Sequence, residues 1–154
     1  MSATEKEKSI YGKGVEVVSR EAGRTIYRIA DDTGNVVMTS YQVFQGIDLT
    51  YNDVHIQECK VDCCPQKNII EINHCREGRF ECEFQNDFVY LGQGDMSIHL
   101  KNQVEQSSCF PLSHYHGISI VIDPEKASCS LSAIFEGIHI DLKGLSDKFS
   151  TASG

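Results

Sequence analysis

The sequence predicts a mainly β fold, an antiparallel barrel followed by α-helices towards the C-terminus. Apolar and polar residues alternate in short runs over 69–73, 80–84 and 96–100, and alternation of period two is typical of half-buried antiparallel strands. Gly78 and the pair 86–87 lie between these runs, where hairpins need residues that tolerate a positive φ. These observations predict several β-hairpins in the middle of the chain.

The composition indicates one globular domain without a membrane span. The chain has 154 residues, of which 40% are hydrophobic, enough to bury a core. It contains no run of about 18 apolar residues that could cross a bilayer, and its charged start has no apolar segment of a secretory signal. We therefore expect a cytoplasmic protein with no membrane partner, whose residues 1–10 form a disordered tail.

The charge argues against nucleic acid as a direct partner of this chain. There are 14 Lys and Arg residues and 22 Asp and Glu residues, which gives a net charge of −8. Duplex binding gains its affinity from basic residues that neutralise phosphates. Zinc-finger, glycine-rich nucleotide-binding and nucleophile-elbow motifs do not occur in the sequence, so the function classes that they mark are not expected.

The first third of the chain predicts four strands. Turn residues at 21–23 and 31–35 separate the first three strands. The four predicted strands cover 15–19, 25–30, 36–39 and 47–55.

In the fourth predicted strand, alternation places Ile47, Leu49, Tyr51, Asp53 and His55 on one face. A buried core explains the two aliphatic residues of this face. It does not explain Asp53 equally well, because a buried carboxylate needs a partner.

Helices are expected only after the last predicted strand, 113–123. Asp123, Pro124 and Glu125 provide the N-cap, the first-position proline and the first-turn acid of a helix start. We expect this helix to reach about residue 135, and a second short helix over 142–149. The predicted organisation is therefore a tail (1–10), a barrel (11–123) and a helical segment (124–154).

The pattern of short strands and glycine-containing hairpins resembles the jelly roll of the cupins. Glu71, six residues and Gly78 match the end of the first cupin motif, but residues 64–67 hold no His-x-His pair before Glu71. In the second motif Ser97 stands in the place of the family's histidine. The resemblance therefore implies a cupin-like antiparallel jelly-roll barrel in which only Glu71 remains of four metal ligands, and no cofactor is expected.

Five blocks of the sequence are distinctive: Tyr41-Gln-Val-Phe-Gln-Gly46, Tyr51-Asn-Asp-Val-His55, Glu71-Ile-Asn-His-Cys-Arg-Glu-Gly-Arg79, Gly92-Gln-Gly-Asp95 and His114-Tyr-His-Gly117. With these blocks, a cupin barrel without its metal ligands, followed by helices in an acidic chain, resembles the N-terminal sensor domain of AraC/XylS-family transcriptional regulators. The resemblance implies an effector-sensing and dimerisation domain that binds a small molecule in the barrel and controls a C-terminal helix-turn-helix DNA-binding domain. This sequence does not contain that DNA-binding part, so DNA would be contacted only through a further domain. We therefore expect a homodimer that is not an enzyme.

The candidate effector-binding residues are polar residues that strand parity is expected to direct into the barrel. Arg79 could pair with a ligand carboxylate through its planar guanidinium, or form a salt bridge with a glutamate at the rim. A register shift of one residue would exchange the two faces and so change the set. The candidates are Tyr51, His55, Glu71, Asn73, Arg79, His114 and His116.

A metal site is an open alternative. His114 and His116 share one strand face and could bind a metal with Cys59, Cys63 and Cys64, as in a metal-dependent cupin enzyme or a Cys/His metal or thiol sensor. We favour hydrogen-bonded histidines at the barrel mouth and free, reduced cysteines, because the seven cysteines are odd in number and no secretion signal is present.

A dimer interface in the helical segment is implied by the family resemblance. Ordinary core packing explains the same apolar residues. These are Leu131, Phe135, Leu142, Leu145 and Phe149.

Overall fold

The computed structural model describes residues 1–59, 69–84, 87–100, 107–128, 141, 143–144 and 147–148. These residues form one N-terminal helix, a set of antiparallel strands and a helical turn over 124–128. The elements are α1 (Glu5–Tyr11), β1 (Glu16–Glu21), β2 (Arg24–Asp31), β3 (Gly34–Phe44), β4 (Ile47–His55), β5 (Glu58–Cys59), β6 (Ile70–Gly78), β7 (Phe80–Phe84), β8 (Asp87–Leu91), β9 (Met96–Leu100), β10 (Ser108–Cys109) and β11 (Tyr115–Ile122).

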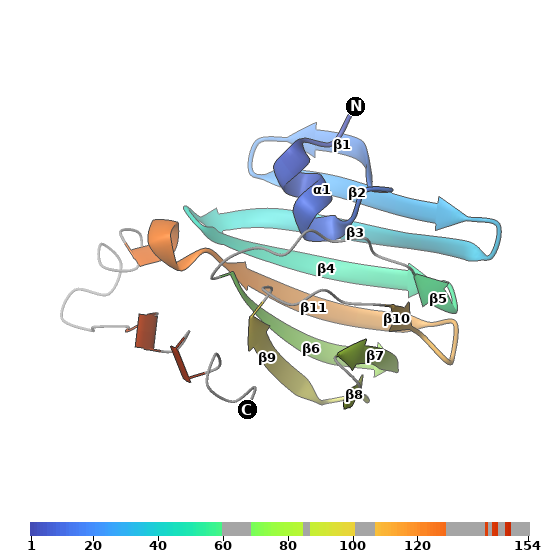
Figure 1. Ribbon diagram of the computed structural model, residues 1–154. Coiled ribbons are helices and arrows are strands. Elements are labelled where there is room, and N and C mark those ends of the chain that lie inside the picture. Colours follow the sequence, from blue (N-terminus) through green and yellow to red (C-terminus); the bar gives the residue numbers. More distant parts are fainter. Residues whose placement is uncertain are drawn as a thin grey trace.

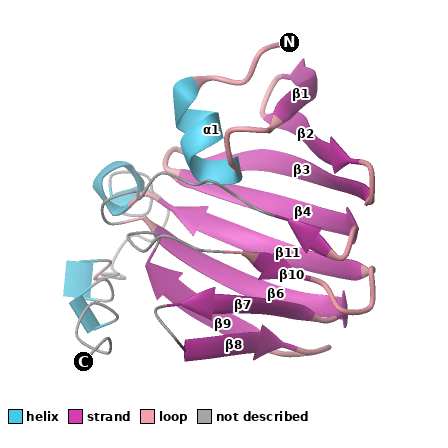
Figure 2. Ribbon diagram, turned by 45° about the vertical axis from the view of Figure 1, so that its right-hand side comes forward, coloured by secondary structure: helices cyan, strands magenta, loops and turns pink. Residues whose placement is uncertain are grey.

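The strands form two sheets (Figure 1). The larger sheet has seven strands in the order β1-β2-β3-β4-β11-β6-β9, and the smaller has four in the order β5-β10-β7-β8. Figures 1 and 2 show the smaller sheet and α1 on the same side of the larger sheet. The predicted mainly β, antiparallel class is confirmed, whereas the ladders of the described residues do not close into a barrel.

Strand β4 has the predicted bounds, and β3 is longer than its alternation predicts. β3 continues to Phe44 because it pairs with β2 along one edge and with β4 along the other. The short strands β5 and β10 were not predicted, since two residues carry no alternation. They pair with each other, and β10 also pairs with β7.

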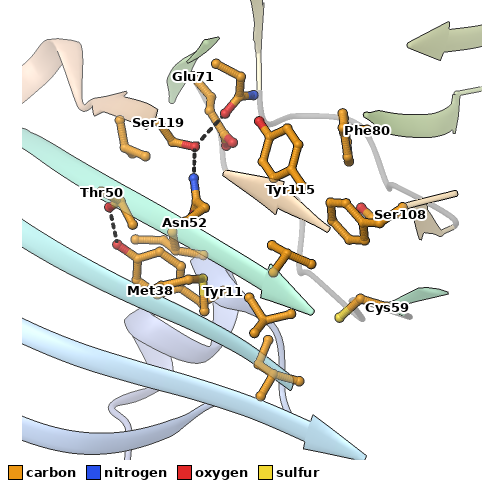
Figure 3. A pocket seen from close by; sticks show the side chains of 17 residues that line it. Tyr11, Met38, Thr50, Asn52, Cys59, Glu71, Phe80, Ser108, Tyr115 and Ser119 are labelled. Carbon is orange, nitrogen blue, oxygen red and sulfur yellow. Dashed lines mark hydrogen bonds between the residues drawn. The ribbon is translucent and has the colours of Figure 1, made fainter. Parts of the chain in front are cut away.

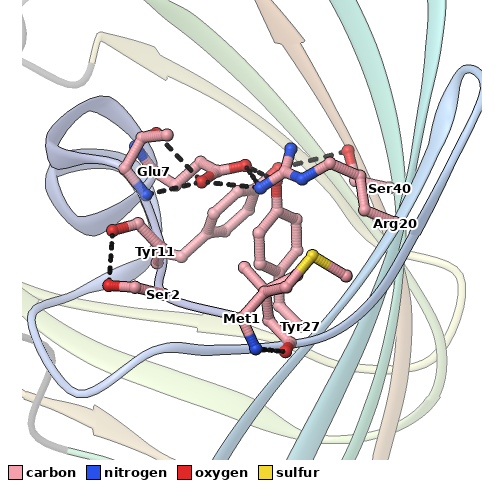
Figure 4. Close-up of polar contacts among 10 residues, drawn as sticks. Met1, Ser2, Glu7, Tyr11, Arg20, Tyr27 and Ser40 are labelled. Atoms are coloured by element: carbon pink, nitrogen blue, oxygen red, sulfur yellow. Dashed lines mark hydrogen bonds and ion pairs between the residues drawn. The ribbon is translucent and has the colours of Figure 1, made fainter.

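The N-terminal residues form helix α1 instead of the expected disordered tail. Thr4 and Glu7 make a capping box, in which the Thr4 backbone N–H donates to Glu7 Oε2 at 2.8 Å. Glu7 Oε1 also accepts hydrogen bonds from Arg20 Nη2 at 2.8 Å and from the Tyr27 hydroxyl at 2.6 Å (Figure 4). The charge of this segment therefore caps the helix and ties it to β1 and β2.

The larger sheet is apolar on parts of both faces. Its inner face contributes to the main core, which includes Tyr27, Met38, Val54 and Tyr115. Residues 124–128 are helical, as the predicted helix start requires. Among them, Ala127 belongs to a second apolar cluster, on the outer face of the sheet. This second cluster consists of Ile47, Ile70, Ile72, Ile98, Leu100, Ile120, Ile122 and Ala127.

No helix among the described residues is long and apolar enough to span a membrane.

Some predictions concern residues outside the described ones. Outside the described residues lie Cys63, Cys64 and the five proposed interface residues Leu131, Phe135, Leu142, Leu145 and Phe149.

Candidate functional site

A cavity of about 140 Å³ lies between the inner face of the larger sheet, the smaller sheet and α1 (Figure 3). Strands β4, β11 and β6 contribute polar side chains to its lining, and Phe80, Phe110 and Tyr115 contribute aromatic side chains. It is lined by Ile10, Tyr11, Ile29, Val36, Met38, Thr50, Asn52, Val54, Cys59, Glu71, Asn73, Phe80, Ser108, Phe110, Tyr115, Ser119 and Val121.

A row of hydrogen-bonded side chains crosses the floor of this cavity. Asn52 Nδ2 on β4 donates to Ser119 Oγ on β11 at 2.8 Å, and Ser119 Oγ donates to Asn73 Oδ1 on β6 at 2.6 Å. The strand register places Asn73 directly opposite Ser119. Asn52 pairs with Gly117, two residues before Ser119 on the same face of β11, and reaches Ser119 diagonally. Glu71 lines the cavity two residues from Asn73 on the same face of β6.

Helix α1 closes one end of the cavity with a tyrosine. The Tyr11 hydroxyl lies 3.2 Å from Ser40 Oγ and 3.3 Å from Thr50 Oγ1. Burial raises the pKa of Tyr11. The phenol therefore remains protonated at neutral pH and holds the helix to β3 and β4 by hydrogen bonds.

The apolar side of the cavity contains an aromatic cluster. The ring centroids of Phe80 and Phe110 are 5.6 Å apart, and both rings lie within 6.0 Å of the Tyr115 ring. Burial also raises the pKa of Tyr115, which keeps its hydroxyl neutral. The cavity thus offers an apolar aromatic lining beside a row of hydrogen-bonding groups.

The predicted candidates on the strands fall on both faces of the sheet. Glu71 and Asn73 line the cavity and so have the predicted inward direction, whereas their binding of a ligand stays a prediction. Tyr51 and His55 lie on the outer face, contrary to the predicted inward direction, because Thr50 on the same strand faces the cavity and successive side chains point to opposite sides.

The two histidines near β11 also lie outside the cavity. His116 alternates with Tyr115, which lines the cavity, and it is partly exposed on the outer face. His114 immediately precedes β11 and contacts Glu77. One ring nitrogen of each of these residues and of His55 lies within 4.8 Å of the others, a grouping that could hold a metal ion.

Arg79 occupies the connection between β6 and β7. Its Nε donates to Glu81 Oε1 at 2.6 Å, and its guanidinium carbon lies 4.6 Å from the centroid of the Tyr90 ring. This is the rim salt bridge that the sequence left as an alternative. Arg79 does not line the cavity.

Cys59 lines the cavity and does not lie with the three histidines. It is buried, and burial raises the pKa of its thiol. A reactive sensor thiol requires the opposite shift. The described cysteine of the predicted cluster therefore has the environment of a small core residue.

Several polar residues of the cavity were missed by the sequence analysis, among them Ser108 and three residues on β4 and β11. Thr50, Asn52 and Ser119 have the opposite strand parity to the candidates on β4 and β11. Ser119 stands between Ile118 and Ile120, and this isolated polar residue in an apolar strand was the available indication.

Comparisons with known proteins give structural similarities at low identity. No family model matches the chain, and no curated protein matches it. A cupin domain of an XRE-family transcriptional regulator from Enterobacter cloacae is similar over 58% of this chain and 97% of that domain, at 14% identity and a TM-score of 0.46. An HTH_3-family transcriptional regulator from Vibrio cholerae is similar over 56% of this chain, at 19% identity and a TM-score of 0.43. The matched part covers 51% of the Vibrio chain, about half its length.

The similar structures include the enzyme HppE with iron(II), over 70% of this chain and 60% of that chain, at 11% identity and a TM-score of 0.47. Regulators and an enzyme thus occur side by side among them. The expectation that the chain is not an enzyme is therefore wrong, because an enzyme stands among the similar structures and an enzymatic role is not excluded.

Proposed function

We propose that this chain is a regulatory domain that binds a small organic molecule in the cavity between its two sheets. The observation that supports the proposal is the row Asn52–Ser119–Asn73, which places hydrogen-bonding groups on the cavity floor beside an aromatic cluster. Ligand sites typically combine a mainly apolar lining with a few fixed polar groups. Such a lining binds a molecule that is partly apolar and carries one or two polar groups.

The volume and the charge of the lining limit the ligand. A dry protein cavity of about 150 Å³ accommodates benzene, so a cavity of about 140 Å³ suits a compact molecule of similar size. Among the described residues, Glu71 is the one acidic side chain of the lining, and a carboxylate is a hydrogen-bond acceptor. We therefore propose a small amine, alcohol or phenol.

The finer part of the proposal rests on the resemblance to AraC/XylS-family sensor domains. In this proposal the chain forms a homodimer, the helical segment 124–154 links the ligand-binding part (11–123) to a DNA-binding domain, and the ligand shifts the population between two arrangements of that pair. The net charge of −8 agrees with DNA contact through another domain. Sedimentation velocity of the purified chain tests the homodimer, and a monomer at micromolar concentrations would contradict it.

Native mass spectrometry of the purified chain, before and after denaturation, tests the cavity directly. A non-covalently bound organic molecule is the expected result. A thermal-unfolding screen with small amines, alcohols and phenols gives a second measurement, because a ligand of the folded state raises the midpoint temperature.

Two variants assign binding to the cavity. Asn73→Leu removes one member of the polar row and should abolish the ligand-dependent rise in unfolding temperature. Thr39→Val changes a residue on the opposite face of the same sheet and should leave the ligand-dependent rise in unfolding temperature unchanged. An equal response of both variants, or no bound molecule and no stabilising compound, would refute the proposal.

A further inference from the structure

Three histidines meet on the outer face of the larger sheet, outside the cavity. His55 ends β4, His116 lies on the neighbouring strand β11, and His114 directly precedes β11. The ring centroids are 4.6 Å apart for His114 and His116, 5.6 Å for His55 and His114, and 6.0 Å for His55 and His116. All three side chains are at least partly accessible to solvent.

Close backbone packing holds two of these histidines in place. A Cβ atom on Gly34 would collide with the carbonyl oxygen of His55, and a Cβ atom on Gly78 would collide with the carbonyl oxygen of His114. Gly78 also has a φ of 84°, which L-residues with a side chain rarely adopt. The two glycines let neighbouring segments approach the histidine main chain, so the imidazoles extend from well-packed backbone.

Two carboxylates lie among the imidazoles. Asp53 Oδ1 lies 2.9 Å from His55 Nε2 and 2.8 Å from His116 Nε2. Glu77 Oε2 lies 3.2 Å from His114 Nε2 and 3.5 Å from His116 Nδ1. Imidazoles from β4 and β11 therefore point at one shared oxygen atom.

Surface ion pairs explain single contacts of this kind but not the convergence of three imidazoles. Neutral rings present lone pairs, and the neutral form is the one that binds metals. Three imidazole nitrogens with a carboxylate oxygen suit zinc and the neighbouring divalent transition metals.

We propose that His55, His114 and His116 bind one divalent ion of the zinc class, Zn²⁺, Co²⁺ or Ni²⁺, with Asp53 completing the ligand set. This site is independent of the cavity, because His116 points to the face opposite its neighbour Tyr115. Its solvent access leaves room for a water molecule or an exogenous ligand on the metal.

Isothermal titration calorimetry of the chelator-treated, purified chain with ZnCl₂ tests the proposal. We expect one ion per chain with micromolar or tighter affinity. His55→Gln, His114→Gln and His116→Gln should each weaken binding by about 100-fold or more, since loss of even an outer partner costs about 10–100-fold. His74→Gln, a change of another histidine on β6 that does not belong to the group, should leave the affinity unchanged.

The cysteines are the competing ligands, and Co²⁺ distinguishes them. Thiolate ligation gives an intense near-ultraviolet charge-transfer band, which nitrogen and oxygen ligands do not give. Absence of saturable Zn²⁺ binding, unchanged affinity in the histidine variants, or a thiolate band that persists in His116→Gln would each overturn the proposal. Asp53→Asn keeps all three imidazoles and provides a milder variant, for which a loss of about 10–100-fold is expected. Circular dichroism confirms that each variant is folded.

Discussion

Ser119 and Asn73 face each other across β11 and β6, and the Ser119 hydroxyl donates a 2.6 Å hydrogen bond to the Asn73 side chain. Both residues are buried. Asn52 on β4 donates to the same hydroxyl, so one serine links three neighbouring strands inside the molecule. This link gives the first prediction.

Ser119→Ala should lower the free energy of unfolding by about 1–3 kcal/mol, because it leaves the buried amide group of Asn73 and the partly buried amide group of Asn52 without this partner. Urea denaturation at pH 7 measures the change. Thr39→Val also removes one hydroxyl from the sheet, but on the outer face, and should change stability by no more than about 0.5 kcal/mol. Equal effects of the two substitutions would show that the polar row does not stabilise the fold.

The contacts of Glu7 should make stability depend on acid pH. Burial opposes ionisation of this carboxyl, but hydrogen bonds from Tyr27, Thr4 and Arg20 outweigh it and lower the pKa of Glu7 from 4.5 to about 2. Because the folded pKa is the lower one, this stabilisation is fully present above about pH 4.5 and is lost as the pH falls towards 2. Its upper limit is about 3 kcal/mol.

Glu7→Gln should therefore destabilise the protein at pH 7 and have a much smaller effect near pH 2. Urea denaturation of the variant and the natural sequence at both pH values measures this difference. Glu5→Gln is the matched control, since the Glu5 side chain is 91% exposed. A Glu7→Gln effect that does not vary with pH would contradict the assignment.

Gly78→Ala should destabilise the protein more than Gly94→Ala. Both glycines have positive φ values, 84° and 89°, so each substitution costs about 1–2 kcal/mol of backbone strain. A Cβ atom on Gly94 meets open space, whereas one on Gly78 collides with the His114 carbonyl. Thermal unfolding of the two variants isolates the collision, and equal midpoints would disprove it.

The thiols of Cys59 and Cys75 should react slowly in the folded protein. Both are buried, and burial raises the pKa of each thiol, so the reactive thiolate is scarce. Peptide mass mapping after timed iodoacetamide treatment at pH 8 should show at least about tenfold slower labelling than in urea, as expected for groups that react only after opening. Cys109, which is partly exposed, should label faster than either.

Alternation predicted the strands but not which face of each strand points inwards. On β11 the isoleucines Ile118 and Ile120 face outwards and Ser119 faces the cavity, the reverse of the usual distribution of apolar and polar residues. The reason is that this sheet packs on both sides, with Ala127 covering apolar residues of its outer face. Hydrophobicity alone therefore could not show which face of β4 points into the cavity. The sequence analysis selected Tyr51 as a candidate instead of its neighbour Asn52, which lines the cavity.

The histidine cluster shows a second limit of sequence reasoning. The i, i+2 spacing indicated that His114 and His116 share a face. The third member, His55, comes from β4, and only the register of β4 against β11 brings it near, with Tyr115 opposite Val54. Pairings between strands distant in the sequence are not encoded in the local spacing of residues.

The position of β11 has a consequence for biosynthesis. This strand fills the space between β4 and β6, and the hydrogen bond from Asn52 to Ser119 joins residues 67 positions apart. The hairpins β2–β3 and β3–β4 can form as soon as they leave the ribosome, but the facing edges of β4 and β6 stay unpaired until residues 115–122 emerge. Open strand edges pair readily with other chains. A nascent chain that stalls before residue 115 therefore exposes two unpaired strand edges, where it can be bound by chaperones or can aggregate with other chains.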